Sequence, residues 1–319
     1  MISEFDLIRR YFSRPAAHTV LGGGDDCALV QPAAGMLLAV STDTLVSDVH
    51  FFADADPALL GWKSLAVNLS DLAAMGAQPR WATLALTVPA ANESWLAAYA
   101  DGLYRCAAAH DISLIGGDTT RGTLSLTLTV IGEVPYDSAL RRDGARTGDA
   151  VWVSGTLGDA AFALAALQGR VEMDEADRAM LETRLHAPTP RVSLGLALRG
   201  LAHGAIDVSD GLAADLGHVL AHSHCGAVID YALLPLSPVV RELTQHPIFD
   251  SCVLAGGDDY ELCFTAPVEA EAEILAIGAR LDVRLTAIGR IVAGSGLQWL
   301  DSAGRLMAAT MTGYDHFAG

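Results

Sequence analysis

The feature that most limits the fold is a regular alternation between short apolar runs and longer segments whose apolar residues recur at helical spacing. Residues 57–75 repeat large apolar side chains every three or four positions, as one face of a helix does. Residues 124–134 instead alternate apolar residues with Thr or Ser, as a half-buried strand does. The same reasoning predicts strands at 36–40 and 81–88 and a second helix at 94–110. The first half is therefore predicted to alternate strands with helices.

A charged, glycine-containing stretch at residues 137–149 is the best candidate for a linker between two domains. The 319 residues also correspond to two domains at about 150 residues each. We predict an α+β protein with domains at residues 1–138 and 139–319. The strands expected in the second half are 151–154, 205–208, 227–231, 261–266 and 284–291, and the expected helices are 159–167, 174–185, 191–201, 212–222 and 269–281.

Composition excludes several classes of protein. The chain is 51% hydrophobic and 18% charged, which favours a folded core over disorder. No apolar run reaches the roughly 18 residues of a membrane span, and charged residues within 1–14 argue against a targeting peptide, so we expect a cytoplasmic protein with no membrane partner. A net charge of −18 without a basic stripe argues against nucleic-acid binding. Five cysteines without a Cys-x-x-Cys pair predict neither a disulfide framework nor a thiolate zinc site.

The single lysine of the chain excludes one common way of binding ATP. Lys63 lies in Gly61-Trp62-Lys63-Ser64, whereas a Walker A loop needs Gly and Lys to be adjacent and followed by Ser or Thr. If the protein uses ATP, it must therefore do so without a P-loop.

Several aspartates lie beside glycines or at the expected ends of apolar strands. One such segment alone is ordinary turn chemistry, because Gly supplies positive φ and Asp hydrogen-bonds its own backbone. Several carboxylates gathered at strand ends, however, repel one another unless cations neutralise them. The five segments are 22–26, 41–44, 116–120, 207–211 and 256–259.

A polar stripe on the helix predicted at 57–75 has two interpretations. Ser64, Asn68 and Asp71 share one face of an otherwise apolar helix. The stripe could face water, but a long solvent-exposed stripe normally carries Lys, Arg or Glu. Short polar side chains suit a closely approached site equally well, so the pattern alone leaves both interpretations open.

The candidate ligands are all hard oxygen donors, and no cluster of His or Cys accompanies them. This donor set selects Mg²⁺ or Ca²⁺ over zinc or iron, and no EF-hand loop is present. Magnesium is usually held by a few carboxylates together with substrate phosphates. Aspartates from several loops therefore predict a site that handles phosphates.

The ordered motifs resemble those of the thiamine-monophosphate kinases, from about Glu4 to Phe317. This family is related to aminoimidazole-ribotide synthetase, selenophosphate synthetase and a hydrogenase-maturation protein. The segments that carry the resemblance are 24–28, 41–46, 67–76, 115–121, 206–212 and 259–262.

The resemblance implies an aminoimidazole-ribotide synthetase-like fold with an N-terminal α/β domain and a C-terminal α+β domain. The N-terminal domain would bind ATP and Mg²⁺ and pair in a homodimer, with ATP in a cleft near the dimer interface. The C-terminal domain would complete the active site. ATP would be the co-substrate, thiamine monophosphate the acceptor, and several Mg²⁺ ions would assist.

The resemblance also assigns roles to individual residues, with catalysis carried by Asp43, Asp71 and Asp210. The implied Mg²⁺ ligands are Asp26, Ser41 (through its carbonyl), Thr42, Asp43, Asp71, Asp118, Asp207 and Asp210. The implied nucleotide contacts are Gly117, Asp118, Arg142 and Ser209, and the implied contacts to thiamine monophosphate are His50, Asp258 and Tyr314. At Asp258 the chain departs from the expected pattern, which has Glu.

Direct in-line transfer is the mechanism these residues favour, because none of them stands out as a covalent nucleophile. Two alternatives stay open at this point. The chain could be a non-catalytic binder of nucleotides or divalent ions, since fold does not fix function. It could also serve another reaction of the related enzymes, but selenophosphate synthetase would need a reactive Cys, for which Cys27 is the nearest candidate, and the hydrogenase-maturation protein would need a C-terminal Cys, where this chain has Gly319.

Overall fold

The computed structural model describes residues 3–307, which divide into two compact units. The first unit comprises the chain up to Leu72 together with Ala77–Asp137, and the second comprises Ala73–Gly76 together with the chain from Ser138 onward. The chain thus passes from the first unit to the second at Asp137 and Ser138, inside the charged stretch that the sequence singles out.

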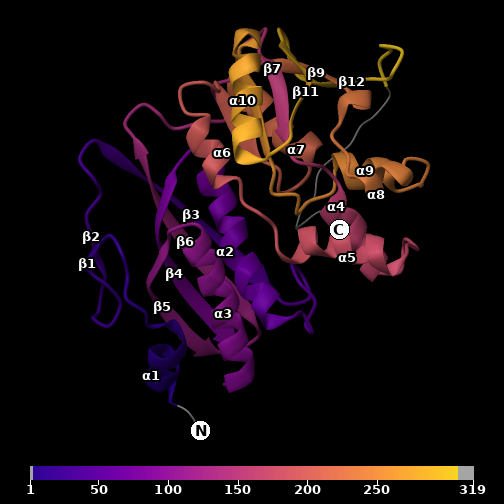
Figure 1. Cartoon of the computed structure of the whole chain (residues 1–319). Helices are drawn as coiled ribbons and strands as arrows, with labels where there is room; N and C mark the ends of the chain where they lie inside the picture. The colour runs from indigo at the N-terminus through magenta and orange to yellow at the C-terminus, as the bar shows by residue number, and fades with distance from the viewer. Residues whose placement is uncertain (1–2, 308–319) are drawn as a thin grey trace. The chain divides into compact units, whose positions relative to one another are not determined.

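The first unit is a four-stranded sheet with two long helices on one face (Figure 1). The strand order is β3–β6–β4–β5, in which β6 pairs antiparallel with β3 and β4, and β5 pairs parallel with β4. The strands are β3 (Met36–Val46), β4 (Gln78–Val88), β5 (Ser113–Arg121) and β6 (Ser125–Pro135), and the helices are α2 (Pro57–Ala74) and α3 (Glu93–Ala109). Before them come α1 (Glu4–Leu7), a π-helical turn (Ile8–Phe12) and the paired strands β1 (Thr19–Leu21) and β2 (Leu29–Val30).

Two glycines let α2 and α3 approach until one backbone touches the other. A Cβ atom on Gly102 of α3 would lie 1.8 Å from the carbonyl oxygen of Ala58, and one on Gly61 of α2 would lie 2.1 Å from that of Tyr99. Close-packed leucines fill the space between these helices and the sheet; they include Leu65, Leu69, Leu72, Leu96, Leu103, Leu126 and Leu128. The helix pair and the sheet therefore form one tightly packed layer structure.

The second unit is a six-stranded sheet in the order β12–β9–β11–β7–β10–β8, antiparallel except where β12 pairs with β9. Its strands are β7 (Ala150–Ser154), β8 (Gly204–Asp207), β9 (Gly226–Asp230), β10 (Leu262–Ala266), β11 (Leu285–Val292) and β12 (Gly296–Leu300). Its α-helices are α4 (Asp159–Leu167), α5 (Glu175–His186), α6 (Val192–Ala197), α7 (Leu212–Ser223), α8 (Pro238–Glu242), α9 (Phe249–Leu254) and α10 (Glu271–Leu281). Short 3-10 turns lie at Tyr231–Leu233 and Val268–Ala270. A continuous apolar core joins the sheet to α4, α5, α7 and α9.

The predicted α+β fold is confirmed, and two predictions about local structure are wrong. The segments 41–44 and 116–120 do not follow strands as turns; they lie inside β3 and β5. The apolar run at 36–40 marks only the first half of β3, because the second half alternates polar and apolar residues. None of the helices within residues 3–307 is long and apolar enough to cross a membrane.

The packing of α2 on α3 predicts a sharp contrast between two helical glycines. Gly102→Ala should destabilise the protein by about 1–3 kcal/mol, the usual cost of overpacking a core, because its Cβ would overlap the backbone of α2. Gly217 lies inside α7 with no atom within 4 Å of the position of an added Cβ. Gly217→Ala should therefore be neutral or stabilising by up to about 1 kcal/mol. Urea denaturation of both variants would check this, and equal midpoints would contradict it.

Candidate active site

The first group of acids lies between β3 and the polar stripe of α2. Asn68 is fully buried, and its Oδ1 accepts a hydrogen bond from the main-chain N–H of Asp43 at 3.1 Å. Its amide nitrogen donates to the carbonyl of Ser64 at 3.0 Å. The hydroxyl of Ser41 donates to the Asp71 carboxylate. Alternate residues of β3 therefore face α2, and the structure brings Ser41, Asp43 and Asp71 together.

The water-facing interpretation of the stripe is wrong. Ser64 and Asn68 have no exposed surface, and Ser64 also contacts the buried hydroxyl of Tyr99 at 3.0 Å. Only Asp71, at the end of the stripe, is half-buried rather than fully enclosed. The stripe thus anchors β3 to α2 and ends in a carboxylate that solvent can reach.

Thr42 points to the other face of the sheet. Its hydroxyl pairs with that of Thr129 on β6 at 2.8 Å, and the next residue of that row, Thr44, pairs with Thr127 at the same distance. The Thr42 side chain is therefore separated by the sheet from the carboxylates of Asp43 and Asp71. Any contact with an ion on their side would have to use its main-chain oxygen.

Asp118 lies at the opposite edge of the sheet from Asp43. The order β3–β6–β4–β5 places three strand spacings between them, which amounts to about 14 Å at about 4.8 Å each. Asp118 is exposed, and the preceding Gly117 has φ +146° and would bring a Cβ within 1.9 Å of the Leu84 carbonyl oxygen. Only glycine fits at position 117, because the backbone of the neighbouring strand β4 lies so close to it.

Asp26 belongs to the β5 side of the first unit. It lies in the glycine-rich loop 22–26, where Gly23 approaches the backbone of Ile115 on β5. Asp26 is exposed, and its main-chain N–H donates to Asp25 Oδ1 at 2.8 Å. The first unit thus carries two separate acid groups, one at each edge of its sheet.

His50 follows the end of β3 in a tight turn. Its Nδ1 accepts a hydrogen bond from the N–H of Val46 at 3.0 Å, and Asp48 within the turn has φ +62°. The half-buried imidazole is therefore held in one orientation next to the strand that carries Asp43.

In the second unit, a loop with three of the expected contacts follows β8. Asp207 is buried at the end of the strand, and Ser209 and Asp210 follow after Val208. Oδ2 of Asp215, in the first turn of α7, accepts hydrogen bonds from the N–H groups of Ser209 and Asp210, both at 3.0 Å. Burial of Asp215 raises its pKa to about 7, and the nearby Asp210 adds to the rise.

The loop before β10 is joined to this first loop by main-chain hydrogen bonds. The N–H of Asp258 donates to the carbonyl of Ser209 at 2.9 Å, and the N–H of Tyr260 donates to that of Val208 at 2.8 Å. Asp258 and Tyr260 both have positive φ, +69° and +48°, and the Tyr260 hydroxyl donates to Asp258 Oδ1 at 2.9 Å. The structure therefore places Asp258 next to Ser209.

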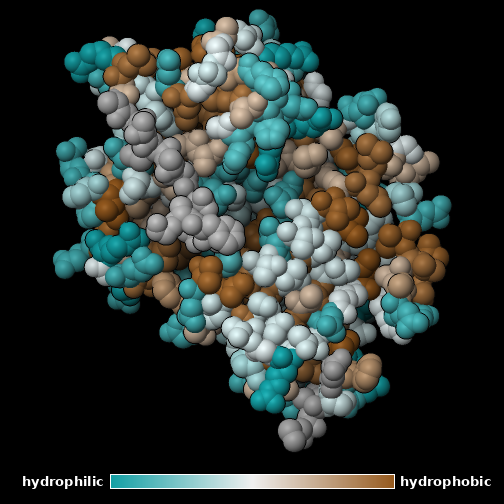
Figure 2. Space-filling model, turned by 180° about the vertical axis from the view of Figure 1, so that it is seen from behind, coloured by the Kyte–Doolittle hydropathy of each residue, from teal (hydrophilic) through white to brown (hydrophobic). Residues whose placement is uncertain are grey.

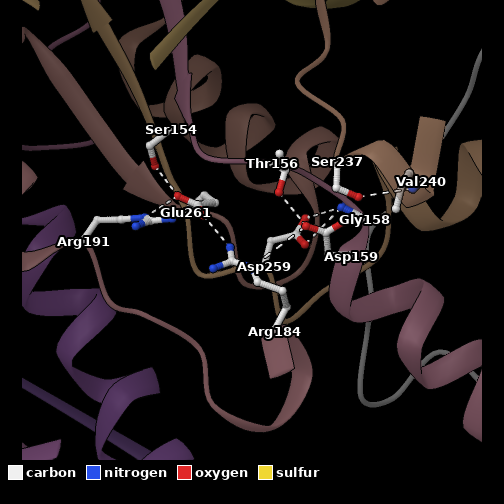
Figure 3. A network of polar contacts seen from close by, with 10 residues as sticks. All are labelled: Ser154, Thr156, Gly158, Asp159, Arg184, Arg191, Ser237, Val240, Asp259 and Glu261. Atoms are coloured by element: carbon white, nitrogen blue, oxygen red, sulfur yellow. Dashed lines mark hydrogen bonds and ion pairs between the residues drawn. The ribbon is translucent and has the colours of Figure 1, made fainter. Parts of the chain in front are cut away.

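A buried polar network underlies the second loop (Figure 3). Glu261 is fully buried and accepts hydrogen bonds from Arg184, Arg191 and Ser154. The Asp259 carboxylate accepts the N–H of Gly158 at 2.9–3.0 Å, and its burial raises its pKa well above the usual range.

The remaining predicted residues lie apart from this network or outside the described part. Arg142 is exposed at the start of the second unit, close enough to Asp215 to lower the pKa of that carboxyl. Tyr314 falls outside residues 3–307. The acid at 215 and the two arginines on Glu261 were not among the residues predicted from the sequence.

The candidate side chains suit Mg²⁺ only if further ligands, such as phosphate oxygens and water, complete its coordination. Within residues 3–307, no group of three or more His, Cys, Asp or Glu side chains is arranged to hold a metal ion. Asp43 and Asp71 with Ser41 form a small hard-oxygen set. Such a set suits an ion that keeps most of its coordination for phosphates and water.

Comparisons with known proteins agree with one another. Models of the AIR synthase related protein family match residues 24–134 with its N-terminal domain and 146–300 with its C-terminal domain. The thiamine-monophosphate kinase of Escherichia coli K12 is 49% identical over 321 residues, covering 99% of this chain and 98% of the relative. The crystal structure of thiamine-monophosphate kinase from Stenotrophomonas maltophilia K279a has a TM-score of 0.85 and 51% identity, covering 92% of this chain and 94% of that one. A ThiL structure in complex with AMPPCP and TMP has a TM-score of 0.77 and 30% identity, covering 98% of this chain and 96% of that one.

The raised pKa of Asp215 predicts a specific pH dependence of stability. A carboxyl whose pKa is about 7 in the folded state, against 3.8 as the ordinary value, stabilises the fold fully below pH 3.8. It loses that contribution as the pH rises through about 7. Asp215→Asn removes this titration, so the melting temperature of the variant relative to wild type should rise between pH 5 and pH 8. Parallel melting curves for the two proteins across this range would contradict the assignment.

Proposed function

Because this chain belongs to the thiamine-monophosphate kinase family, we propose that it transfers the γ-phosphoryl group of ATP to the phosphate of thiamine monophosphate, giving ADP and thiamine diphosphate. The observation that carries this conclusion is the likeness to kinases of this name over essentially the whole of both chains. A relative binds AMPPCP and TMP together, which matches the two substrates of the reaction. The alternatives of a non-catalytic binder or a selenophosphate synthetase are not favoured.

The chemical problem at this site is charge repulsion rather than nucleophile activation. The acceptor phosphate is already ionised near neutral pH and needs no general base, but two polyanions must meet on a protein of net charge −18. The only lysine, Lys63, is buried on α2, which leaves arginines such as the exposed Arg142 as the cationic side chains. Main-chain N–H groups of the glycine-rich turns add donors for phosphate oxygens.

Magnesium is the ion that the oxygen donors favour. Asp43, Asp71 and the Ser41 carbonyl would hold it in the first unit, and Asp207 and Asp210 would do so in the second. Bound Mg²⁺ would neutralise these carboxylates and screen the charge on the phosphates. The protein's own part is to position the acid segments and the two substrates in line for direct transfer.

A homodimer through the first unit is supported by the face of the sheet opposite α2 and α3. Leu38 and Val40 on this face of β3 are 42% and 61% exposed, large fractions for side chains of this kind. Figure 2 is turned by 180° from Figure 1, and hydrophobic surface gathers at its right, the side to which this turn brings β1 and β2. Val20 of β1 is also exposed. Exposed apolar surface of this kind marks an interaction site, and a two-fold pairing of identical faces is the commonest form of assembly.

Such a dimer would resolve the separation between Asp43 and Asp118. These acids lie at opposite edges of one sheet, about 14 Å apart by strand spacing. When two sheets pair face to face about a two-fold axis, the β5 edge of one copy can meet the β3 edge of the other. The register places Asp118 on the same face as Thr44, so it would reach the metal and nucleotide site of the second copy around the β3 edge of that copy.

The kinase activity is tested directly by product analysis. Protein incubated with ATP, Mg²⁺ and thiamine monophosphate should form thiamine diphosphate and ADP, and EDTA should abolish the reaction. Asp71→Asn should lose turnover yet melt at or above the wild-type temperature, because a repelling charge is removed. The matched control is Asp101→Asn, which alters an exposed ion pair with Arg105 and should stay active. Turnover in EDTA, or an unfolded Asp71→Asn, would contradict this part of the proposal.

The shared site predicts that two inactive variants restore each other. A heterodimer purified through two different tags, with Asp43→Asn in one copy and Asp118→Asn in the other, contains one intact site if Asp118 acts on the second copy. Its activity should be about half that of wild type, since one of two symmetric sites survives. Each variant alone should be inactive. A heterodimer as inactive as its parents would place both residues in the same copy.

A further inference from the structure

We propose that Asp215 is a positioning residue for the kinase reaction, which holds the loop 207–211 and, through it, the loop 256–260. One buried carboxylate would thereby set the positions of both the nucleotide contact at Ser209 and the substrate contact at Asp258. The inference rests on the proposed function for what these contacts bind.

The first link is a pair of hydrogen bonds that run back from α7 to the preceding loop. Asp215 is 3% exposed, and its Oδ2 accepts the N–H groups of both Ser209 and Asp210. The helix has no capping side chain of its own, since Gly211 occupies the N-cap position with φ +105°. A Cβ on Gly211 would lie 2.7 Å from the backbone of Ala255, so no side chain can take over this role. Asp215 thus satisfies the loop's donors from inside the helix.

The second link passes through the peptide groups of Ser209. Its N–H donates to Asp215, while its carbonyl accepts the N–H of Asp258 at 2.9 Å. Gly257 packs against the same carbonyl, because a Cβ there would lie 2.4 Å from the Ser209 oxygen. Hydrogen bonds therefore hold the main chain of Ser209 on both sides. A displacement of Ser209 after loss of the Asp215 contact would also displace Asp258.

The second loop needs such support because its backbone is strained. Asp258 and Tyr260 both adopt left-handed φ values that side chains other than glycine rarely take. Residues held in this region cost on the order of 1 kcal/mol or more each and persist only where the surroundings determine them. The network on Glu261 fixes this loop from one side, and Ser209 fixes it from the other.

Both bonds to Asp215 end on the same oxygen. The N–H groups of Ser209 and Asp210 each donate to Oδ2 at 3.0 Å, so removing this oxygen leaves two main-chain donors without their partner. Asn at this position keeps the shape and one acceptor oxygen, whereas Ala removes both bonds. The effect of losing this contact should therefore be smaller in Asp215→Asn than in Asp215→Ala.

The experiment compares Asp215→Asn and Asp215→Ala with Asp258→Ala and a matched control. The control is Asp149→Asn, which alters another buried carboxylate of the second unit that accepts a main-chain N–H, from Arg146, at 2.9 Å. Steady-state kinetics give kcat and KM for ATP and for thiamine monophosphate. Hydrogen exchange of peptides covering 204–212 and 255–261 gives a readout independent of activity.

Asp215→Ala should lower kcat/KM for both substrates by about 10- to 100-fold, the loss expected when a buried hydrogen-bonding partner is removed. Asp215→Asn should lie between Ala and wild type. Asp258→Ala should raise KM for thiamine monophosphate only, and Asp149→Asn should leave both values within about threefold. Exchange should accelerate in both peptides of the Asp215 variants, because the second loop loses its support when the first is released.

Unchanged kinetics in Asp215→Ala would overturn the proposal, and so would faster exchange confined to 204–212. If Asp215→Ala does not fold, Asp215→Asn and Gly257→Ala test the same joint, the latter from the opposite side by displacing the Ser209 carbonyl. Gly257→Ala should lower kcat/KM for both substrates. A lower value for one substrate alone would count against the coupling. If wild type makes no thiamine diphosphate, the proposed function fails, while the exchange data still decide whether the loops are coupled.

Discussion

In each of the two units, an acidic segment of candidate site residues depends on a buried polar side chain that hydrogen-bonds its main chain. In the first unit Asn68 accepts the N–H of Asp43, and in the second Asp215 accepts those of Ser209 and Asp210. Because these bonds go to peptide groups, positioning the segment does not require its carboxylate. Neighbouring carboxylates repel one another and need cations. Because the main chain holds these segments in place, their carboxylates need no neutralising side chain from the protein and stay available to bind cations.

Much of the fold could be predicted from periodicity, because core-facing residues fix the regular elements. The helix expected at 159–167 is α4, and the stripe of α2 is where the spacing placed it. The strand β5 could not be predicted, since its Gly116-Gly117 pair resembles a turn. Gly117 is needed because the backbone of β4 passes beside it, at the carbonyl of Leu84. Such a contact depends on a strand that is distant in sequence.

The candidate site shows the same division between local and tertiary information. The sequence motifs identified the acidic residues of the candidate site. No feature of the local sequence, however, indicates that Asp43 and Asp118 lie at opposite edges of a sheet. The arginines that hold Glu261 come from positions 184 and 191, outside any motif. Asp215 lies a few residues beyond a motif, where its helical position resembles an ordinary polar face. Only the folded structure shows that its side chain accepts hydrogen bonds from the preceding loop.

The strand order is consistent with the proposal that the site is shared between two copies. Within residues 3–307, no group of three or more His, Cys, Asp or Glu side chains is arranged to hold a metal ion. The acids of β3 and those near β5 stay about 14 Å apart within one copy. Concentrated negative charge would then arise only when a second copy, cations and phosphates arrive together. Under the proposed dimer, assembly of the site would be linked to the presence of the cations and phosphates that stabilise it, and the acids of one copy would stay apart until then.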